Sequence, residues 1–358
     1  MKTSILPNER SSAGSPFVRI LREGAWPALR LLARPDTLAQ IPRLFREGIG
    51  PAQRLFIQAH NHREIARMIR EQVPMTFVSS YLRCGSTWMC YLLCDILLQN
   101  RGIRTSTELP FDRKKIILDQ YARLIARRDR SADASGCIIK THDLIPLLQE
   151  QIGGDPGIRE CKYLYLYRTP EDALVSTCHL YRREKYLRSK PAYALACRDM
   201  DLFCLEFLPG LIEHVQGYLD ALDEGVDVHL VSYDQLQART AEVLTETLRW
   251  LAIPHTEAIV AHAVSNTQFS NLQAMEAKTL GGQIPFFRRG CAGAGAAELK
   301  PETLSKIRSA TKDLINRADE RLARQALRLQ AVRESSAFRN EPQAPVGRAE
   351  AITASSGR

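Results

Sequence analysis

The pattern that most limits the fold of this chain is an alternation of short apolar runs with helical stretches between residues 75 and 251. Runs rich in β-forming residues lie at 75–80, 137–140, 162–167 and 228–232. Helical patterning follows the first run at 86–99 and the last at 241–251. Strands that alternate with helices form a parallel sheet covered by helices on both faces. The expected class is therefore α/β, a three-layer fold with a central, mostly parallel sheet flanked by helices.

Composition restricts the partners only coarsely. The formal net charge of +9 favours an anionic partner, which could be nucleic acid, an acidic membrane or a phosphate-rich small molecule. No RNA-binding signature occurs, so nucleic acid is not expected. No run of about 18 apolar residues is present, so no transmembrane segment is expected. The nine cysteines stand singly, which favours reduced thiols in a cytoplasmic protein and gives no reason to expect a metal.

Three segments of different character divide the chain. Residues 1–73 are rich in Arg, and prolines interrupt their helical spacing of apolar residues, so we expect a helical N-terminal extension. A peripheral membrane helix or a targeting segment would have a similar composition. Residues 74–325 form the main domain. Residues 326–358 hold the end of a helix and, from about 333, a tail whose Ser, Arg, Ala and Pro content predicts disorder.

The first predicted strand ends in the sequence YLRCGSTW (81–88), which leads directly into a helix. Ligands of parallel sheets bind at the carboxyl ends of the strands, and a tight turn before a helix presents N–H groups to an anion. Arg83 adds a positive charge, and the hydroxyls of Ser86 and Thr87 add donors. The GxxxxGK[ST] sequence is absent, which disfavours ATP hydrolysis. A purely structural helix cap beside an arginine would have the same sequence.

The next two strands end in further charged residues. Lys140 and His142 follow the second strand: a histidine suits proton removal from a hydroxyl, and a lysine can neutralise charge on a leaving oxygen. Arg168 follows the third strand, and Ser176 lies two turns into the next helix, so both could hold one phosphate. A structural histidine and an Arg168 ion pair with Glu171 or Asp172 are the alternatives.

The remaining candidates lie later in the chain. Tyr233 follows the fourth strand, Thr267 and Phe269 offer a donor and a stacking ring, and Arg288 and Arg289 precede Gly290. Singly, each of these is equally compatible with packing. Aromatic residues that either line an acceptor pocket or belong to the core are Tyr181, Tyr186, Tyr193, Phe203, Phe207 and Phe286.

Taken in order, these segments resemble the sulfotransferases that use 3'-phosphoadenosine 5'-phosphosulfate (PAPS), particularly their cytosolic small-molecule branch. YLRCGSTW (81–88) is similar to the 5'-phosphosulfate loop of that family, and YRTPEDALVSTCHLYR (167–182) to its 3'-phosphate motif. IIKTHDL (138–144) is similar to the segment that carries its catalytic base. HLVSYDQL, NTQFSNL and FFRRG follow in the order of the family. The similarity covers about residues 74–320.

The resemblance implies a P-loop-like fold and transfer of a sulfuryl group from PAPS to an acceptor hydroxyl, with release of PAP and without a metal. His142 would be the general base, and Lys140 and Arg83 would stabilise developing charge. The loop 83–87 would hold the 5'-phosphate, Arg168 with Ser176 the 3'-phosphate, and aromatic rings the adenine. The residues expected to contact PAPS are Arg83, Cys84, Gly85, Ser86, Thr87, Trp88, Arg168, Ser176, Tyr233, Thr267, Phe269, Arg288, Arg289 and Gly290.

Departures from the family pattern leave alternatives open. Arg83 replaces a lysine, so the charge is kept but proton donation is not. Cys84 would be prone to oxidation if Arg83 and the helix end favoured its thiolate. The sequence GAGA at 293–296 lacks the usual Trp and Lys, which leaves the oligomeric state open. The expected acceptor is a phenol or alcohol small molecule; a protein tyrosine, a carbohydrate, a P-loop small-molecule kinase and a non-catalytic PAP-binding or nucleic-acid-binding protein are the alternatives.

Overall fold

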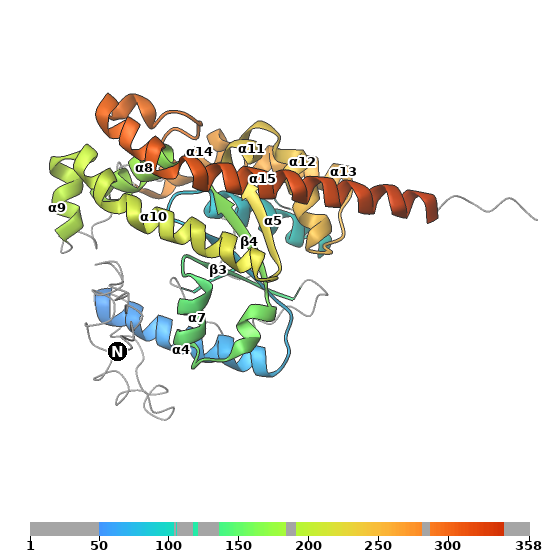
Figure 1. The fold of residues 1–358 in the computed structure, drawn as a ribbon. Helices are drawn as coiled ribbons and strands as arrows, with labels where there is room; N and C mark the ends of the chain where they lie inside the picture. The colour runs from blue at the N-terminus through green and yellow to red at the C-terminus, as the bar shows by residue number, and fades with distance from the viewer. Residues whose placement is uncertain are drawn as a thin grey trace, which may run out of the picture.

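The structure, a computed structural model, describes residues 50–103, 105, 117–120, 136–183, 191–280 and 287–339. A five-stranded sheet with the order β2-β3-β1-β4-β5 lies at the centre, and every neighbouring pair of strands is parallel. The strands are β1 (Met75–Ser80), β2 (Ile117–Asp119), β3 (Cys137–Thr141), β4 (Lys162–Tyr167) and β5 (Val228–Ser232). The predicted three-layer α/β class is confirmed (Figure 1).

Helices cover both faces of this sheet. One face packs against α4 (Gly50–Arg70), α7 (Ile145–Gln151), α8 (Pro170–Arg183), α10 (Met200–Asp223) and α15 (Pro301–Arg339). The other packs against α5 (Ser86–Asn100), α12 (Thr240–Trp250) and α13 (Glu257–Asn266). The remaining helices are α9 (Pro191–Arg198), α11 (Tyr233–Ala238) and α14 (Phe269–Leu280), with short 3₁₀ turns at Pro156–Glu160 and Ala296–Glu298. Figure 1 shows α15 running alongside α10.

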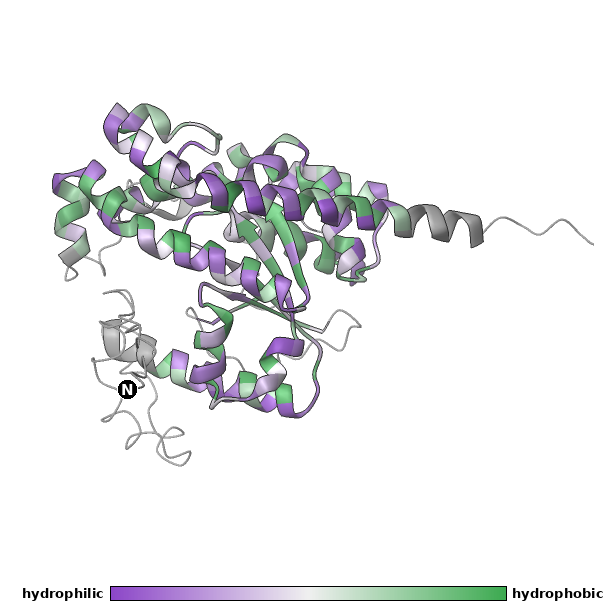
Figure 2. Ribbon diagram, viewed as in Figure 1, coloured by the Kyte–Doolittle hydropathy of each residue, from purple (hydrophilic) through white to green (hydrophobic). Residues whose placement is uncertain are grey.

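The strand β4 shows why the sheet is buried on both faces. In its sequence KYLYLY, the side chains of Tyr163, Tyr165 and Tyr167 enter the core beneath α10, whereas Leu164 and Leu166 enter the core beneath α5. Successive side chains of a strand point to opposite faces, so alternating tyrosines and leucines fill the two cores. Figure 2 shows green stretches along the central strands, where their apolar residues lie.

The four predicted strands hold to within a residue, a fifth strand (β2) was not predicted, and the expectation for the C-terminal tail needs correction. β2 lies inside the stretch 101–136, whose basic composition hides a strand of only three residues. The helix α15 continues to Arg339, whereas we expected disorder from about 333. Residues 333–339, RESSAFR, include Arg, Glu and Ala, which are strong helix formers and favour continuation of the helix despite the low apolar content.

The N-terminal expectation is tested only in part. α4 shows that the extension is helical from Gly50, while residues 1–49 lie outside the described part of the chain. Tyr181 and Phe203 belong to the core, with exposed fractions of 6% and 0%, whereas Tyr186 and Phe286 fall outside the described residues. Among the helices that the structure describes, none has the length and apolar character needed to cross a bilayer.

Candidate active site

The polar residues predicted from the sequence gather at the carboxyl edge of the sheet. β1 is flanked by β3 and β4, and β5 follows β4, so the segments that leave these four strands are neighbours. They carry the loop 81–86 after β1, Lys140 and His142 at the end of β3, Arg168 after β4 and Tyr233 after β5. The parallel arrangement thus brings together residues up to about 150 positions apart in sequence.

The loop after β1 has a constrained backbone. Arg83 and Gly85 adopt positive φ angles of 67° and 98°, and Gly85 is the N-cap residue of α5. A Cβ atom at Gly85 would lie 2.5 Å from Cδ2 of Tyr233, so glycine is needed both for its conformation and for this close approach. The hydroxyl of Ser80 donates to Oγ of Ser86 over 2.9 Å, which ties the strand end to the first turn of the helix.

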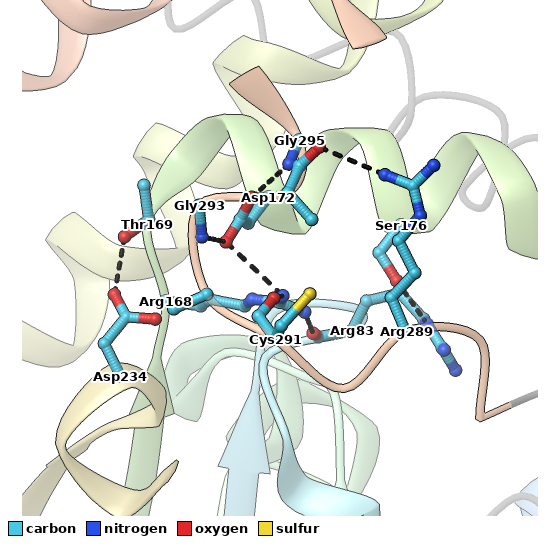
Figure 3. A network of polar contacts seen from close by, with 12 residues as sticks. Arg83, Arg168, Thr169, Asp172, Ser176, Asp234, Arg289, Cys291, Gly293 and Gly295 are labelled. Carbon is cyan, nitrogen blue, oxygen red and sulfur yellow. Dashed lines mark hydrogen bonds and ion pairs between the residues drawn. The ribbon is translucent and has the colours of Figure 1, made fainter. Parts of the chain in front are cut away.

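Two arginines from different strands meet beside this loop (Figure 3). Nε of Arg83 donates to Oγ of Ser176 on α8 over 3.0 Å. The guanidinium of Arg168 lies 4.2 Å from the ring centroid of Tyr233 and donates to the carbonyl of Arg83 over 3.4 Å. The structure therefore places Arg83, Arg168 and Ser176 in one cluster, whereas the sequence predicted Ser176 beside Arg168 and assigned Arg83 to the other end of the nucleotide.

Arg168 is also held by its own helix and by a distant loop. It donates to the carbonyl of Cys291 over 3.1 Å, and it pairs with Asp172 at 3.4 Å, which was one of the structural alternatives. Glu171, the other alternative, pairs with Arg308 instead. Nε of Arg168 is buried and has no hydrogen-bond partner among the described residues. A buried donor of this kind requires an acceptor, and a bound anion would supply one.

The arginine cluster is electrostatically strained. Burial, with help from the positive charges of Arg168 and Arg183, lowers the pKa of Arg83 to about 10. The side chain therefore stays protonated at neutral pH, but its charge lies in a poorly solvated place beside like charges. Glu276 offsets part of this effect on Arg83, and an anion bound beside the two arginines would stabilise their charges further.

A glycine-rich loop closes the cluster from the side of α8. The carboxylate of Asp172 accepts hydrogen bonds from the backbone N–H groups of Gly293 and Gly295, at 2.7 Å and 2.5 Å (Figure 3). A Cβ atom at Gly295 would lie 2.7 Å from the carbonyl oxygen of Glu171, so this position needs a glycine. The sequence GAGA, which departs from the family pattern, is thus the part of the loop that packs directly on α8.

Two arginines at the start of the loop 287–295 share one carboxylate. Arg288 and Arg289 pair with Glu298 at 2.7 Å and 3.1 Å. Burial would raise the pKa of Glu298, but hydrogen bonds from His179 and Arg288 outweigh burial and the net shift is downward. Gly290 follows with a φ of 62° and packs against the ring of Phe269. The loop 287–295 therefore links the charged residues to α14.

The aromatic candidates form a second cluster. The indole of Trp88 lies 6.1 Å from the ring of Tyr233, and its Nε1 donates to the carbonyl of Thr267 over 3.0 Å. The hydroxyl of Thr267 donates to the carbonyl of Ala263 over 2.8 Å. Because that hydroxyl proton is already used, Thr267 does not supply the donor that we expected; it orients Trp88 instead.

The histidine at the end of β3 is held in one tautomer. Nδ1 of His142 lies 2.8 Å from the carbonyl oxygen of Ser80. A carbonyl only accepts hydrogen bonds, so Nδ1 carries the proton and Nε2 carries the basic lone pair. Lys140 lies two residues earlier, opposite Val78 of β1, and is half-buried. This arrangement suits removal of a proton from a hydroxyl beside a positive charge.

Two expectations about the site need revision. Cys84 is buried, and burial raises the pKa of its thiol to about 12, so the thiolate that oxidation requires is not favoured. Sequence reasoning also missed the residues that hold the His142 segment, namely Gln120 after β2 and both His214 and Tyr218 on α10. No motif marks them, because a lone polar residue in an apolar helix or strand has no distinctive sequence signal.

Comparison with known proteins agrees with this geometry. Residues 74–324 match the family described as "Sulfotransferase domain". The chain is 22% identical over 254 residues to cytosolic sulfotransferase 5 of Arabidopsis thaliana, which covers 64% of this chain and 76% of that protein. It is 23% identical over 253 residues to cytosolic sulfotransferase 16 of the same plant, covering 64% and 72%. A crystal structure of retinol dehydratase in a complex with retinol and PAP superposes with a TM-score of 0.51 at 17% identity, covering 71% of this chain and 85% of that one.

Proposed function

The chain belongs to the sulfotransferase family, and on that premise we propose that it transfers a sulfuryl group from PAPS to a hydroxyl of a small-molecule acceptor, a phenol or an alcohol, and releases PAP. The observation that supports this most strongly is the half-buried pair of Arg83 and Arg168 at the sheet edge, where the buried Nε of Arg168 lacks a partner within the described residues. Phosphate suits such a site, because its oxygens accept several charge-assisted hydrogen bonds.

In this proposal each end of the nucleotide has its own set of residues. The 3'-phosphate is held by Arg168 and Ser176, with Arg288, Arg289 and Gly290 closing over it. The 5'-phosphate is held by N–H groups at the start of α5, in the segment 85–87, with Arg83 and the hydroxyls of Ser86 and Thr87. The adenine packs between Trp88 and Phe269. The retinol dehydratase neighbour binds PAP, which supports a nucleotide of this kind.

PAPS supplies the activated sulfuryl group, and side chains on β3 and its following loop act on the acceptor. His142 takes the proton of the acceptor hydroxyl on Nε2, which the hydrogen bond from Nδ1 to Ser80 keeps unprotonated. Lys140 and Arg83 stabilise the negative charge that develops as the sulfuryl group leaves phosphate. Positioning and electrostatics provide most of the rate in this account. The relatives are named cytosolic, and we place the reaction in the cytoplasm.

Calorimetric titration of the purified protein with PAP, adenosine 5'-phosphosulfate and ATP–Mg²⁺ in parallel tests the nucleotide. We expect PAP to bind tightly and ATP–Mg²⁺ weakly or not at all. Tight ATP–Mg²⁺ binding without a PAP signal would instead favour a kinase.

Sulfur-35-labelled PAPS then tests the acceptor class against 4-nitrophenol, 2-naphthol, a sterol alcohol, a tyrosine peptide and a sugar. We expect transfer to the phenols or the alcohol, and transfer to the peptide or the sugar alone would contradict the proposed class. His142→Ala should abolish transfer with every acceptor, because it removes the proposed base, while PAP affinity stays within about twofold. Loss of both together would contradict the role of His142 as a base.

A further inference from the structure

Two side chains of α10 form hydrogen bonds to the backbone of the segment that carries His142. Nε2 of His214 lies 3.0 Å from the carbonyl oxygen of His142, and the hydroxyl of Tyr218 donates to the carbonyl of Asp143 over 2.9 Å. Residues 214 and 218 are one helical turn apart and therefore lie on the same face of α10. Two consecutive carbonyls after β3 are thus fixed by one helix.

His214 itself has a single arrangement of protons. Nε2 of His214 faces the carbonyl oxygen of His142, which can only accept, so in the neutral ring Nε2 carries the proton and Nδ1 is the acceptor. The hydroxyl of Tyr165 of β4, 2.9 Å from Nδ1, therefore donates to it. His214 is buried among the rings of Tyr81, Tyr165 and Tyr218, and burial lowers its pKa to about 4. The neutral form of His214 is consequently the one present at neutral pH.

These contacts form two separate runs of hydrogen bonds that meet at residue 142. The first runs from the hydroxyl of Tyr165 through the ring of His214 to the backbone carbonyl of His142. The second is the hydrogen bond from Nδ1 of the His142 ring to the carbonyl of Ser80, and this bond alone holds the ring proton on Nδ1, away from Nε2. The first run acts on the second only through the position of the His142 backbone.

We propose that His214 is a positioning residue for the general base: it holds the backbone of His142 where the imidazole can donate to Ser80, and so keeps Nε2 unprotonated. This inference rests on the proposed function, in which His142 is the base. His214 touches neither nucleotide nor acceptor in this account. Without its hydrogen bond the segment after β3 can shift, the ring loses the carbonyl of Ser80, and the proton can occupy Nε2 instead.

The test compares His214→Phe, which keeps a ring between the tyrosines, with His214→Gln, whose amide can again donate to the carbonyl of His142. A matched control is His229→Phe, because His229 is another buried histidine, stacked on Trp250 at 4.9 Å and without contact to the site. The readouts are the imidazole ¹⁵N–¹H spectrum of His142, identified by its loss in His142→Gln, PAP affinity by calorimetry, and turnover of 4-nitrophenol with labelled PAPS.

We expect His214→Phe to convert the single Nδ1–H signature of His142 into a mixture of tautomers and to lower kcat at least about tenfold. The KM for PAPS and the PAP affinity should stay within about twofold, and His214→Gln should restore both the signature and most of the rate. His229→Phe should change neither. An unchanged His142 signature in folded His214→Phe would overturn the inference.

Two further arms keep the outcome decisive. If His214→Phe does not fold, His214→Asn takes its place, because its shorter side chain holds the amide farther from the carbonyl of His142, and an unaltered His142 spectrum in that variant overturns the inference equally. The spectrum is also recorded without nucleotide. If wild-type protein fails to bind PAP, the proposed function fails, whereas the tautomer of His142 in the free protein still decides the role of His214.

Discussion

Arg168 shows how one residue combines a binding and a structural role. Its guanidinium contacts the ring of Tyr233, a carbonyl of the loop after β1 and a carbonyl of the loop 287–295. Three segments that are distant in sequence therefore depend on one side chain for their arrangement. The partial neutralisation by Asp172 does not remove the need for an anion, because the buried Nε still lacks an acceptor within the described residues.

We expect Arg168→Ala to weaken PAP binding by about 2 kcal/mol or more, which corresponds to roughly 30-fold in Kd. The control is Arg308→Ala. This substitution removes the ion-pair partner of Glu171, which neighbours the site, and the Arg308 side chain is itself 59% exposed. Arg308→Ala should leave PAP affinity within about twofold. Calorimetry measures both, and wild-type affinity in Arg168→Ala would refute the phosphate role of Arg168.

Two features exclude a larger residue at Gly85: its φ of 98°, and the ring of Tyr233, which lies where a Cβ atom would be. We expect Gly85→Ala to push Tyr233 away from Arg168 and to weaken PAP binding at least about tenfold. Gly154→Ala is the matched control, because Gly154 has a φ of 84° but no atom within 4 Å of the added Cβ. That control should cost about 1–2 kcal/mol of unfolding free energy without changing PAP affinity. Equal PAP affinities in both variants would contradict the steric argument.

The helix α4 is connected to the site through Gln120, although α4 precedes the residues that match the family, 74–324. Asn61 of α4 donates to the carbonyl of Gln120 over 2.9 Å, and Nε2 of Gln120 lies 3.3 Å from Nε2 of His62. The same amide donates to the carboxylate of Asp143 over 2.6 Å. The N-terminal extension is therefore connected, through Gln120, to the residue that follows His142.

We expect Gln120→Leu to reduce the unfolding free energy by about 1–3 kcal/mol, because it leaves the Asp143 carboxylate and the His62 ring without this buried donor. Gln149→Leu is the control, since its hydrogen bond to the carbonyl of Gly154 is solvent-exposed and should contribute less than about 0.5 kcal/mol. Urea denaturation gives both values. Faster hydrogen exchange in α4 of Gln120→Leu, but not of Gln149→Leu, would show that the lost stability involves α4. Identical urea midpoints for the two variants would refute the predicted role of Gln120.

For the molecule as a whole, buried histidines make stability depend on pH. Burial lowers the pKa values of His62 and His214 to about 4 and that of His229 to about 3, all below the ordinary value of 6.5. Below pH 6.5 the unfolded chain takes up protons at these positions while the folded chain does not. Their contribution is therefore fully present above pH 6.5 and is lost progressively as the pH falls toward 4.

We expect the unfolding free energy to fall between pH 6.5 and pH 4, with each of these histidines adding up to about 1.4 kcal/mol per pH unit to the slope. His229→Gln cannot titrate and should show a shallower slope below pH 6.5, with no change of slope above it. Urea denaturation at several pH values measures this. Parallel curves for wild type and His229→Gln across the whole range would contradict the assignment.

Much of the fold could be predicted from the sequence alone. The runs at Met75–Ser80, Lys162–Tyr167 and Val228–Ser232 are rich in β-forming residues, and nearly all of their side chains are buried. The candidate residues Arg83, Arg168 and Ser176 could be named because they follow predicted strands, and their roles are proposals. Local patterning along the chain therefore determined the α/β class, whereas the contact between Arg83 and Ser176 did not follow from it.

Only the tertiary structure decided what holds these residues in place. His214, Gln120 and Asp172 act through atoms contributed by other elements, at separations of 72, 23 and 123 residues from their partners. Such contacts depend on packing geometry, which no local pattern records, and the same holds for the hydroxyl of Thr267 and the burial of Cys84. A sequence shows which groups a chain carries, but the free energy of burying a group depends on neighbours that only folding brings together.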